Sequence, residues 1–358
     1  LSFVSWARRC VEETGVKSII GKGYRIALFS LSEKTTSWAN GLDNFEYRCF
    51  GISSNQIKSN RRFGKLTYFS AQKEVREYAK SIQPAIVHAH YASSYGTLAR
   101  QLGYPETVLS LWGSDVYEFP KRSPIHRILF KKAVKFARIV CSTSEDMAKE
   151  AKKYVNREIT ITPFGVDMDR FVPAEDTTIE RTVTIGTVKS LEEVYGIDRL
   201  IALYADFQSK VSFPTKLAIY GDGSLEKELK SQVNELRIED KVTFHGRVEG
   251  QALIQAFQSL DIFVALSRRE SFGVAALEAQ ACGIPVLVSN VGGLPEVTSP
   301  KTGKIVEEDA PEKWTATLME LVEESKSPNT ATLTRGFVQE NYSHEVCVDK
   351  LIEVYRHV

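Results

Sequence analysis

The sequence predicts an α/β protein made of two doubly wound domains, and three observations lead to this fold class. The chain has 358 residues, enough for two domains of about 150 to 200 residues that each bury a core. Short runs of β-branched residues alternate with stretches of helical periodicity, the pattern of parallel sheets covered by helices on both faces. A segment with two prolines, residues 161–176, separates the halves.

Nine apolar runs are predicted to be strands, and most of the segments between them supply helices. The first half contains the runs at residues 25–30, 85–91, 106–113 and 138–144. The second half contains those at residues 182–188, 215–221, 241–246, 261–267 and 284–290. Helical periodicity is clear in residues 123–140, 144–155 and 224–238.

Composition restricts the class of protein. No window approaches the roughly 20 apolar residues of a membrane span, and the first ten residues lack the apolar core of a secretory signal. We therefore expect a cytoplasmic protein. The five cysteines are far apart and odd in number, so neither a disulfide framework nor a zinc site is expected.

The net charge of +1 hides an asymmetry between the halves. Residues 1–165 contain 26 Lys and Arg against 14 Asp and Glu, whereas the remainder contains 20 against 31. A basic first half is suited to anionic lipid, a polyanionic substrate or nucleic acid. Alternatively, the opposite charges only help the two domains attract each other.

Two glutamates in one apolar stretch form the main candidate site. Residues 261–290 are predicted to form a strand, a helix ended by Gly283, and a second strand. Ligands of such sheets bind at the carboxyl ends of the strands, where free N–H groups at the helix start, around Phe272–Val274, attract anions. Glu270 lies in the loop before this helix and Glu278 lies within it.

The spacing of these glutamates argues against an acid and base pair. Eight residues of helix span about 12 Å, more than the roughly 5 to 9.5 Å between the carboxylates of a glycosidase. A carboxylate beside a phosphate site is suited to accept hydrogen bonds from a ribose diol, which favours Glu278 for that role. The alternative is that Glu278 belongs to a structural ion pair and Glu270 is a solvated loop residue.

Two further features are weaker. Gly221 and Gly223 follow a strand and open a helix, but a single Gly-x-Gly indicates a tight turn more often than a phosphate site. His245 is expected to be an ordinary histidine at a strand end.

Long segments of the sequence resemble family 4 glycosyltransferases, which are retaining enzymes with nucleotide-sugar donors. The most specific segment is "ESFGVAALEAQACGIPVLVSNVGGLPEV", residues 270–297. The others are "VHAHYASSYGTLAR", "WGSDVYEFP", "TPFGVDMDRF", "IGTVKSLEEVYGIDRLI", "YGDGSLEKEL" and "VTFHGRV". The resemblance implies the GT-B fold, in which two Rossmann-like domains face a central cleft. It divides the chain into an acceptor domain (1–165), a donor domain (166–340) and a helix that returns to the first domain (341–358).

The resemblance also implies roles for residues of the second domain. Glu270 would contact the donor sugar and stabilise charge in the transition state, and Glu278 would bind the ribose. Lys189, at the end of a predicted strand, would neutralise the diphosphate leaving group, a demand that is greatest where no metal is present. The other donor-binding candidates are Gly221, Arg247, Val248, Ser271, Phe272, Gly273 and Val274.

Relatives usually offer two basic residues at the diphosphate. This chain has Val194 and Tyr195 near the expected second cation, and Arg268 or Arg269 is a candidate to compensate.

In the first domain, Trp112 replaces the histidine of a His-Gly-Ser/Thr-Asp segment, so Trp112, Gly113 and Ser114 are candidates for the acceptor side. Asp115 is a candidate base or hydrogen-bond acceptor for the acceptor hydroxyl. His88 and His90 alternate with Ala89 and therefore share a face of their strand. A metal site would need a third ligand, so His90 is expected either at the acceptor or in a structural role.

Basic residues in two places raise the question of a membrane surface. Residues 123–140 place Arg127, Lys131, Lys135 and Arg138 in a stripe opposite Ile128, Leu129 and Phe136. Arg61, Arg62 and Lys65 form a second cluster. Such runs of basic residues are often only solvent-exposed helix faces. If the acceptor is linked to a lipid, however, they would favour peripheral binding of the protein to an anionic membrane.

The sequence therefore predicts a retaining hexosyl- or hexosaminyl-transferase. A UDP-sugar is the expected donor, a glycan or lipid-linked molecule the acceptor, and no metal, cofactor or nucleic acid is expected. One alternative is a catalytically silent homologue that binds nucleotide or glycan and regulates a partner, favoured by Trp112 and the missing second cation. A second alternative is a dinucleotide oxidoreductase, which is supported only by the sheet pattern and the segment "GDG".

Overall fold

The structure is a computed structural model that describes residues 2–3, 9–32, 41–52, 64–174 and 182–358. The chain divides into two compact units. The first contains residues 1–165 together with 344–358, and the second contains residues 166–343. The second segment of the first unit thus starts three residues after the predicted position 341.

The first unit is built on a parallel sheet with the strand order β3-β2-β1-β4-β5-β6-β7 among its described residues. Because the chain runs outward from β1 to β3 and in the other direction from β4 to β7, the topological switch point lies between β1 and β4. The strands are β1 (Ser2–Phe3), β2 (Ile26–Ser32), β3 (Phe45–Ile52), β4 (Val87–His90), β5 (Thr107–Leu111), β6 (Ile139–Ser142) and β7 (Thr160–Ile161).

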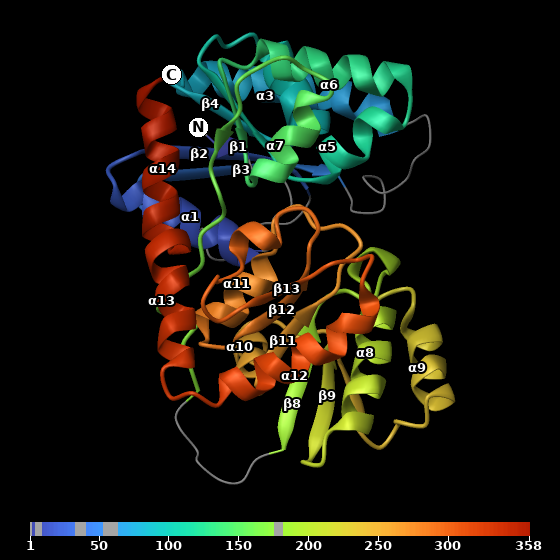
Figure 1. Cartoon of the computed structure of the whole chain (residues 1–358). Coiled ribbons are helices and arrows are strands. Elements are labelled where there is room, and N and C mark those ends of the chain that lie inside the picture. The colour runs from blue at the N-terminus through green and yellow to red at the C-terminus, as the bar shows by residue number, and fades with distance from the viewer. Residues whose placement is uncertain (1, 4–8, 33–40, 53–63, 175–181) are drawn as a thin grey trace. The chain divides into compact units, whose positions relative to one another are not determined.

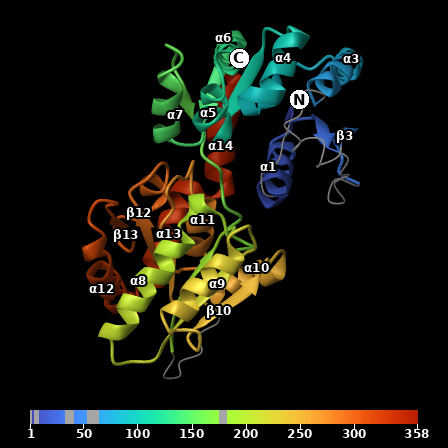
Figure 2. The ribbon, with the colours of Figure 1, turned by 90° about the vertical axis from the view of Figure 1, so that its right-hand side faces the viewer.

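Helices cover both faces of this sheet (Figures 1 and 2). They are α1 (Arg9–Gly21), α3 (Gly64–Ile82), α4 (Gly96–Leu102), α5 (Ser114–Tyr117), α6 (Pro124–Phe136), α7 (Glu145–Lys152) and α14 (His344–Arg356), with a π-helical turn η2 (Tyr91–Tyr95) and a 3-10 turn η3 (Phe119–Lys121).

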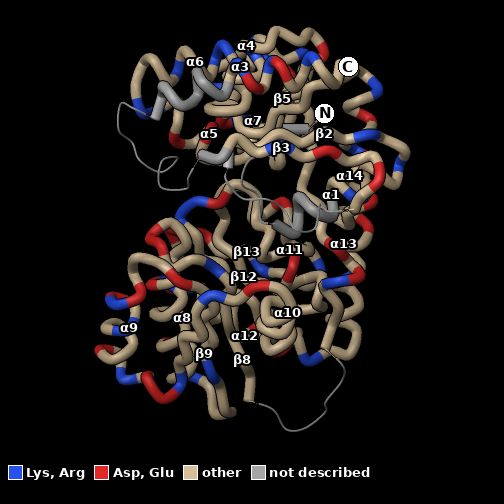
Figure 3. Tube along the Cα trace, turned by 180° about the vertical axis from the view of Figure 1, so that it is seen from behind, with Lys and Arg blue, Asp and Glu red and all other residues tan. Residues whose placement is uncertain are grey.

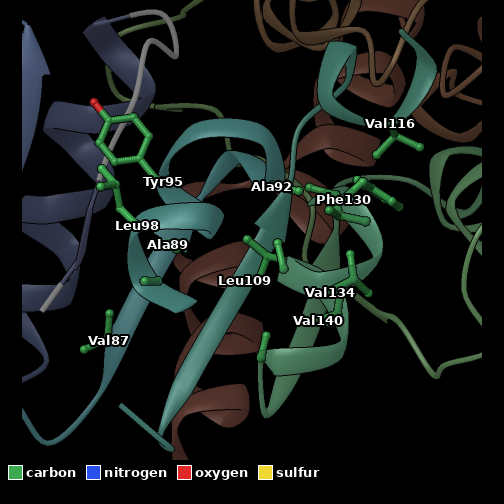
Figure 4. Close-up of a cluster of buried hydrophobic side chains, with 14 of the residues drawn as sticks. Val87, Ala89, Ala92, Tyr95, Leu98, Leu109, Val116, Phe130, Val134 and Val140 are labelled. Carbon is green, nitrogen blue, oxygen red and sulfur yellow. The ribbon is translucent and has the colours of Figure 1, made fainter. Parts of the chain in front are cut away.

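The core of the first unit follows the alternation of side chains along its strands. Ala89 and Leu109 point to the face covered by α4 and α6, where they pack with Phe130 and other residues of the cluster in Figure 4. The opposite face packs against α1 and α14, with Val16 and Val348 among the buried side chains. The carboxyl-terminal helix is therefore an integral part of the first unit.

The second unit contains a parallel sheet with the order β10-β9-β8-β11-β12-β13 in its described part. Its switch point lies between β8 and β11, because the chain moves outward from each of these strands in opposite directions. The strands are β8 (Val183–Val188), β9 (Thr215–Tyr220), β10 (Val242–Gly246), β11 (Ile262–Ala265), β12 (Val286–Ser289) and β13 (Lys304–Val306).

Three helices of the second unit pack with the main core cluster, and in a second group α11 contacts α10 and α13 (Figure 1). The first group is α8 (Ile197–Lys210), α9 (Glu226–Glu235) and α12 (Trp314–Ser325). The second group is α10 (Gln251–Gln258), α11 (Val274–Ala281) and α13 (Thr330–Tyr342). The short turns are η4 (Glu193–Tyr195), η5 (Pro295–Val297) and η6 (Pro311–Lys313).

All nine predicted strands are confirmed, whereas β1, β3, β7 and β13 were not predicted. The predicted packing face of α6 was wrong. Ile128 is 51% exposed, and the buried side chains are Phe130 and, about one helical turn later, Ala133 and Val134. Arg61 and Arg62 lie outside the described residues, as does the side chain of Lys65. No helix in the described ranges is both long and apolar enough to cross a membrane.

Candidate active site

A buried ion pair marks the switch point of the second sheet. Lys189 directly follows β8, and its ammonium group donates to the Glu270 carboxylate, which stands in the loop after β11. The Lys189 side chain is 6% exposed and that of Glu270 is 13% exposed. Since β8 and β11 are neighbours at the point where the strand order reverses, both residues lie where open α/β sheets bind their ligands.

Two glycines hold the backbone that carries Lys189. A Cβ atom on Gly221 would lie 1.9 Å from the carbonyl oxygen of Lys189, and one on Gly223 would lie 2.4 Å from that of Leu191. The Lys189 N–H donates to the Tyr220 carbonyl at 3.0 Å. Gly221 and Gly223 therefore allow a close approach of two backbones, which agrees with the tight turn that the sequence favoured.

Another pair of glycines holds the loop of Glu270. Gly292 has a φ of +55°, and a Cβ atom there would lie 1.7 Å from the Glu270 carbonyl oxygen. The N–H of Gly293 donates to that same oxygen at 3.1 Å. Sequence reasoning missed this support, although the "VGG" directly after a strand was a signal for a close backbone approach.

Helix α11 begins beside this loop. Gly273 caps it with a φ of +107°, and a Cβ atom there would lie 3.0 Å from side-chain atoms of both Leu294 and Val297. The absence of a side chain is thus explained by internal packing. Phe272 is buried with its ring against Tyr342, so only its backbone can meet a ligand. Ser271 and Val274 are half-buried.

Glu278 lies in the middle of α11 and is 2% exposed. Its negative charge contributes, after burial, to the raised pKa of the Cys282 thiol one turn further on, which is about 12. The structure places this carboxylate on the same helix that starts beside Glu270, as the sequence predicted.

Lys189 makes an aromatic contact near the position where a second cation was expected. The Lys189 ammonium nitrogen lies 5.1 Å from the centre of the Tyr195 ring, within range of a cation–π interaction. Arg268 is instead committed to Asp198 through hydrogen bonds of 2.8 and 2.6 Å, which hold the pKa of that carboxyl below its usual value. To compensate at the diphosphate, Arg268 would have to leave this pair, so its role there stays a prediction. Arg269 is exposed.

The ends of β9 and β10 extend the same edge of the sheet. The N–H of Gly221 donates to the Gly246 carbonyl at 2.8 Å, which ties the two strand ends together. Arg247 follows on an exposed loop and pairs with Glu249 at 2.6 Å, while Val248 is half-buried. Lys189, Gly221 and the residues after Gly246 thus form a row along the carboxyl ends of β8, β9 and β10.

In the first unit, Asp115 has a structural role. Its side chain is fully buried; one oxygen accepts from Ala92 N–H at 2.8 Å, and the other from Gly113 N–H at 2.8 Å and Trp112 N–H at 3.2 Å. Burial raises its pKa against the effect of these donors. The expectation that Asp115 faces a ligand was wrong, because both oxygens fasten the loop after β5 to the turn after β4.

The histidines and Trp112 form an aromatic row. The rings of His88 and His90 are 4.0 Å apart, and those of His90 and Trp112 are 4.8 Å apart. The shared face predicted for the two histidines is confirmed. Burial lowers the pKa of His90 to about 3, so its imidazole is neutral near pH 7. The Ser114 hydroxyl contacts the Tyr91 hydroxyl. Among the described residues, no group of three or more His, Cys, Asp or Glu side chains could hold a metal.

Comparison with known proteins connects both units to one family. Residues 7–144 match the model described as glycosyl transferase 4-like, and residues 172–332 match the model described as glycosyl transferases group 1. The chain belongs to the family 4-like glycosyltransferases. Its two doubly wound units are the two Rossmann-like domains of the GT-B fold.

Individual relatives of this chain are distant in sequence. The D-inositol 3-phosphate glycosyltransferase of Corynebacterium jeikeium is 28% identical over 266 residues, which cover 66% of this chain and 64% of that protein. A GDP-mannose-dependent monoacylated alpha-(1-6)-phosphatidylinositol monomannoside mannosyltransferase of Corynebacterium glutamicum is 31% identical over 211 residues, 54% of each chain. The matches thus span less than two thirds of these relatives. The solved structure of Anabaena HepE with UDP and glucose has a TM-score of 0.77 at 15% identity and covers 100% of this chain and 99% of that one.

Proposed function

We propose that this protein transfers a sugar from a nucleotide-sugar donor to a glycan or lipid-linked acceptor with retention of anomeric configuration. The observation that supports this most directly is the buried Lys189–Glu270 pair at the switch point of the second sheet, beside the start of α11. A diphosphate needs a cation and backbone N–H groups, and both are available here.

The proposed chemistry is electrostatic. The bond between the anomeric carbon and the diphosphate oxygen breaks, its electron pair stays on the diphosphate, and the acceptor oxygen forms the new bond on the same face. The acceptor proton passes to the leaving phosphate, so no protein base is needed. This agrees with the structural role of Asp115, whose oxygens already accept three backbone N–H groups.

Lys189 and Glu270 have separate roles in this scheme. The diphosphate competes with Glu270 for the Lys189 ammonium group, and the negative charge that grows on the leaving group makes this contact stronger in the transition state. The Glu270 carboxylate, once released, accepts hydrogen bonds from the donor sugar and stabilises the positive charge that develops on it.

We favour a UDP-sugar as donor and expect transfer without a bound metal. The UDP and glucose of the Anabaena protein support this choice by analogy of fold, whereas the name of the Corynebacterium glutamicum relative points to GDP-mannose. Release of nucleotide from UDP-, GDP- and ADP-sugars, with and without a chelator, decides between them. A donor that binds also raises the melting temperature by mass action.

Exchange of each glutamate for glutamine tests the site. Glu270→Gln should lower kcat by about 100-fold or more and leave the nucleotide Kd within about threefold, because its contact is made mainly in the transition state. Glu278→Gln should raise the nucleotide Kd by about tenfold through the lost hydrogen bonds to ribose. Glu235→Gln, on an exposed position of α9, is the matched control.

The same experiment separates the proposal from its rival. A wild-type protein that binds nucleotide but turns over no donor would be the silent homologue that the missing second cation suggests. Both glutamine variants could instead lose the same unfolding free energy without a specific change in kcat or in the nucleotide Kd. Glu278 would then have a purely structural role.

We further propose that the first unit binds an anionic membrane surface through α6. Ile125 and Ile128 are 63% and 51% exposed on this helix. Exposed cations accompany them, namely Lys121, Arg122, Arg127, Lys132 and Lys135. Figure 3 marks the positions of Lys and Arg along the chain in blue. Apolar side chains between cations are typical of surfaces that insert into the headgroup region of anionic lipids.

A further inference from the structure

The first unit contains a cavity of about 110 Å³ that the proposed chemistry does not use. Its walls come from α1, α14, the ends of β4 and β5, and residues 162–165. The apolar part of the wall includes Val16, Ile19, Val348 and Leu351, and the aromatic part includes Trp112 and Phe164. The rings of Trp112 and Phe164 meet edge to face at 5.3 Å, and both are half-buried.

The described part of the wall carries no carboxylate, ammonium or guanidinium group. None of the described residues that line it is Asp, Glu, Lys or Arg. Burial lowers the pKa of both His88 and His90, so these imidazoles are neutral near pH 7. His344, which also contributes to the wall, is half-buried. An anionic or cationic group would lose its hydration in this cavity without gaining an opposite charge from such a wall.

Three of the polar side chains that line the cavity, those of His88, Ser110 and Tyr355, are engaged with one another. The Nδ1 atom of His88 lies 2.7 Å from the Tyr355 hydroxyl, and its Nε2 atom lies 2.8 Å from the Ser110 hydroxyl. Both ring nitrogens of His88 are therefore occupied. A sugar with several hydroxyl groups would have to break these contacts to be satisfied, whereas an alkyl group would not.

We propose that this cavity binds the uncharged end of an alkyl chain. Its volume is somewhat smaller than that of an apolar cavity of about 150 Å³ that takes up benzene or xenon, so it holds a chain end or a single small ring. The Trp112 ring adds apolar surface to the wall. The proposal concerns binding alone and does not depend on the transferase reaction.

A series of primary alcohols tests the proposal on the full-length chain. Calorimetric titration with 1-butanol, 1-pentanol, 1-hexanol and 1-octanol should show one saturable site. The affinity should rise by about fourfold per methylene, from about 0.8 kcal/mol for each buried CH₂, and level off once the cavity is filled. Hexanoate should bind at least about tenfold more weakly than 1-hexanol, because its charge would be desolvated.

Glycine substitutions provide a matched pair of variants. Gly15 lines the cavity from α1, and a Cβ atom there meets no atom within 4 Å; Gly21 lies on the same helix with equally open surroundings but does not line the cavity. Gly15→Leu should fill the cavity and remove binding without loss of unfolding free energy, because leucine is the better helix former. Gly21→Leu should bind as wild type does.

Three results would overturn the proposal. They are the absence of saturable alcohol binding to the wild-type chain, equal binding by both glycine variants, and tighter binding of hexanoate than of 1-hexanol. If the alcohols bound at α6 instead, both glycine variants would bind alike or no saturable site would be found. The affinity would then keep rising for alcohols longer than 1-octanol.

Discussion

The ring of Tyr195 lies 5.1 Å from the Lys189 ammonium nitrogen, so this lysine contacts an aromatic face as well as the Glu270 carboxylate. Tyr195 occupies η4, close to the position at which the family resemblance implies a second cation. An aromatic ring there cannot neutralise phosphate charge, but it holds the remaining ammonium group in place. We infer that Tyr195 is a positioning residue for Lys189.

Removal of the Tyr195 ring should weaken donor binding. Tyr195→Leu should raise the donor KM by about 3- to 30-fold, which corresponds to a cation–π energy of about 0.5 to 2 kcal/mol. Tyr195→Phe keeps the ring face and should leave KM within about twofold. Steady-state kinetics over a range of donor concentrations measures both. If the phenylalanine variant lost as much as the leucine variant, the hydroxyl and not the ring face would be the important group.

Much of the candidate site could be predicted because it depends on strand ends. Lys189 and Glu270 each follow an apolar run, and parallel strands bring such positions to one edge of a sheet. The strand order, which makes β8 and β11 neighbours, depends on packing between distant segments and was not readable from either run alone.

Contacts made by backbone atoms or by long-range packing could not be predicted from the sequence. Asp115 looked like a base because its residue type suits that role, yet its loop folds so that backbone N–H groups reach both oxygens. Strands β7 and β13 are two and three residues long, too short for a periodic signal. Strand β3 alternates apolar residues with Glu46 and Arg48, and this pattern was overlooked.

The buried state of His90 predicts a pH dependence of stability. The folded pKa is about 3, whereas the unfolded chain should titrate near 6.5. Below about pH 6.5 the unfolded state binds a proton that the folded state does not, so the unfolding free energy falls as the pH falls. Between about pH 7.5 and pH 5 this group alone should remove about 2 kcal/mol.

Urea unfolding of wild type and His90→Gln should be compared across this pH range. The difference between them isolates the contribution of the His90 imidazole to the pH dependence of the unfolding free energy. The variant should lose about 2 kcal/mol less than wild type between the two pH values, whatever its absolute stability. His357→Gln removes an exposed imidazole near the carboxyl terminus and is the control. Parallel pH curves for wild type and His90→Gln would show that His90 is not held neutral by the fold.

The exposed isoleucines of α6 predict binding to anionic vesicles. The wild-type chain should sediment with phosphatidylglycerol vesicles more than with phosphatidylcholine vesicles, and added salt should weaken this binding because it screens the cations. Replacement of Ile125 and Ile128 by serine should lower the partition coefficient by about tenfold or more through lost apolar insertion. Leu333→Ser, at a 44% exposed site in the second unit, should have no effect. Failure of the wild-type chain to bind either vesicle would remove the proposed membrane surface.

The contact between Gly292 and Glu270 predicts a large effect from a single methyl group. In Gly292→Ala the new Cβ atom would lie 1.7 Å from the Glu270 carbonyl oxygen, so one of the two loops must move. The displaced Glu270 carboxylate should then lose its position beside Lys189, and kcat should fall by about 100-fold or more, as expected for a misplaced group in an electrostatic site.

Gly250→Ala is the matched control for this variant. Gly250 has a φ of +61°, close to the +55° of Gly292, but a Cβ atom there meets no atom within 4 Å. Its replacement should cost about 1 to 3 kcal/mol of unfolding free energy, because the φ of +61° and ψ of −130° at this position favour glycine, and it should leave kcat unchanged. Gly292→Ala should also affect kcat, since its Cβ atom would clash with the Glu270 carbonyl oxygen whereas that of Gly250→Ala meets no atom within 4 Å. Equal losses in the two variants, with wild-type kcat in both, would mean that the loop of Glu270 is free to adjust and that Gly292 does not position it.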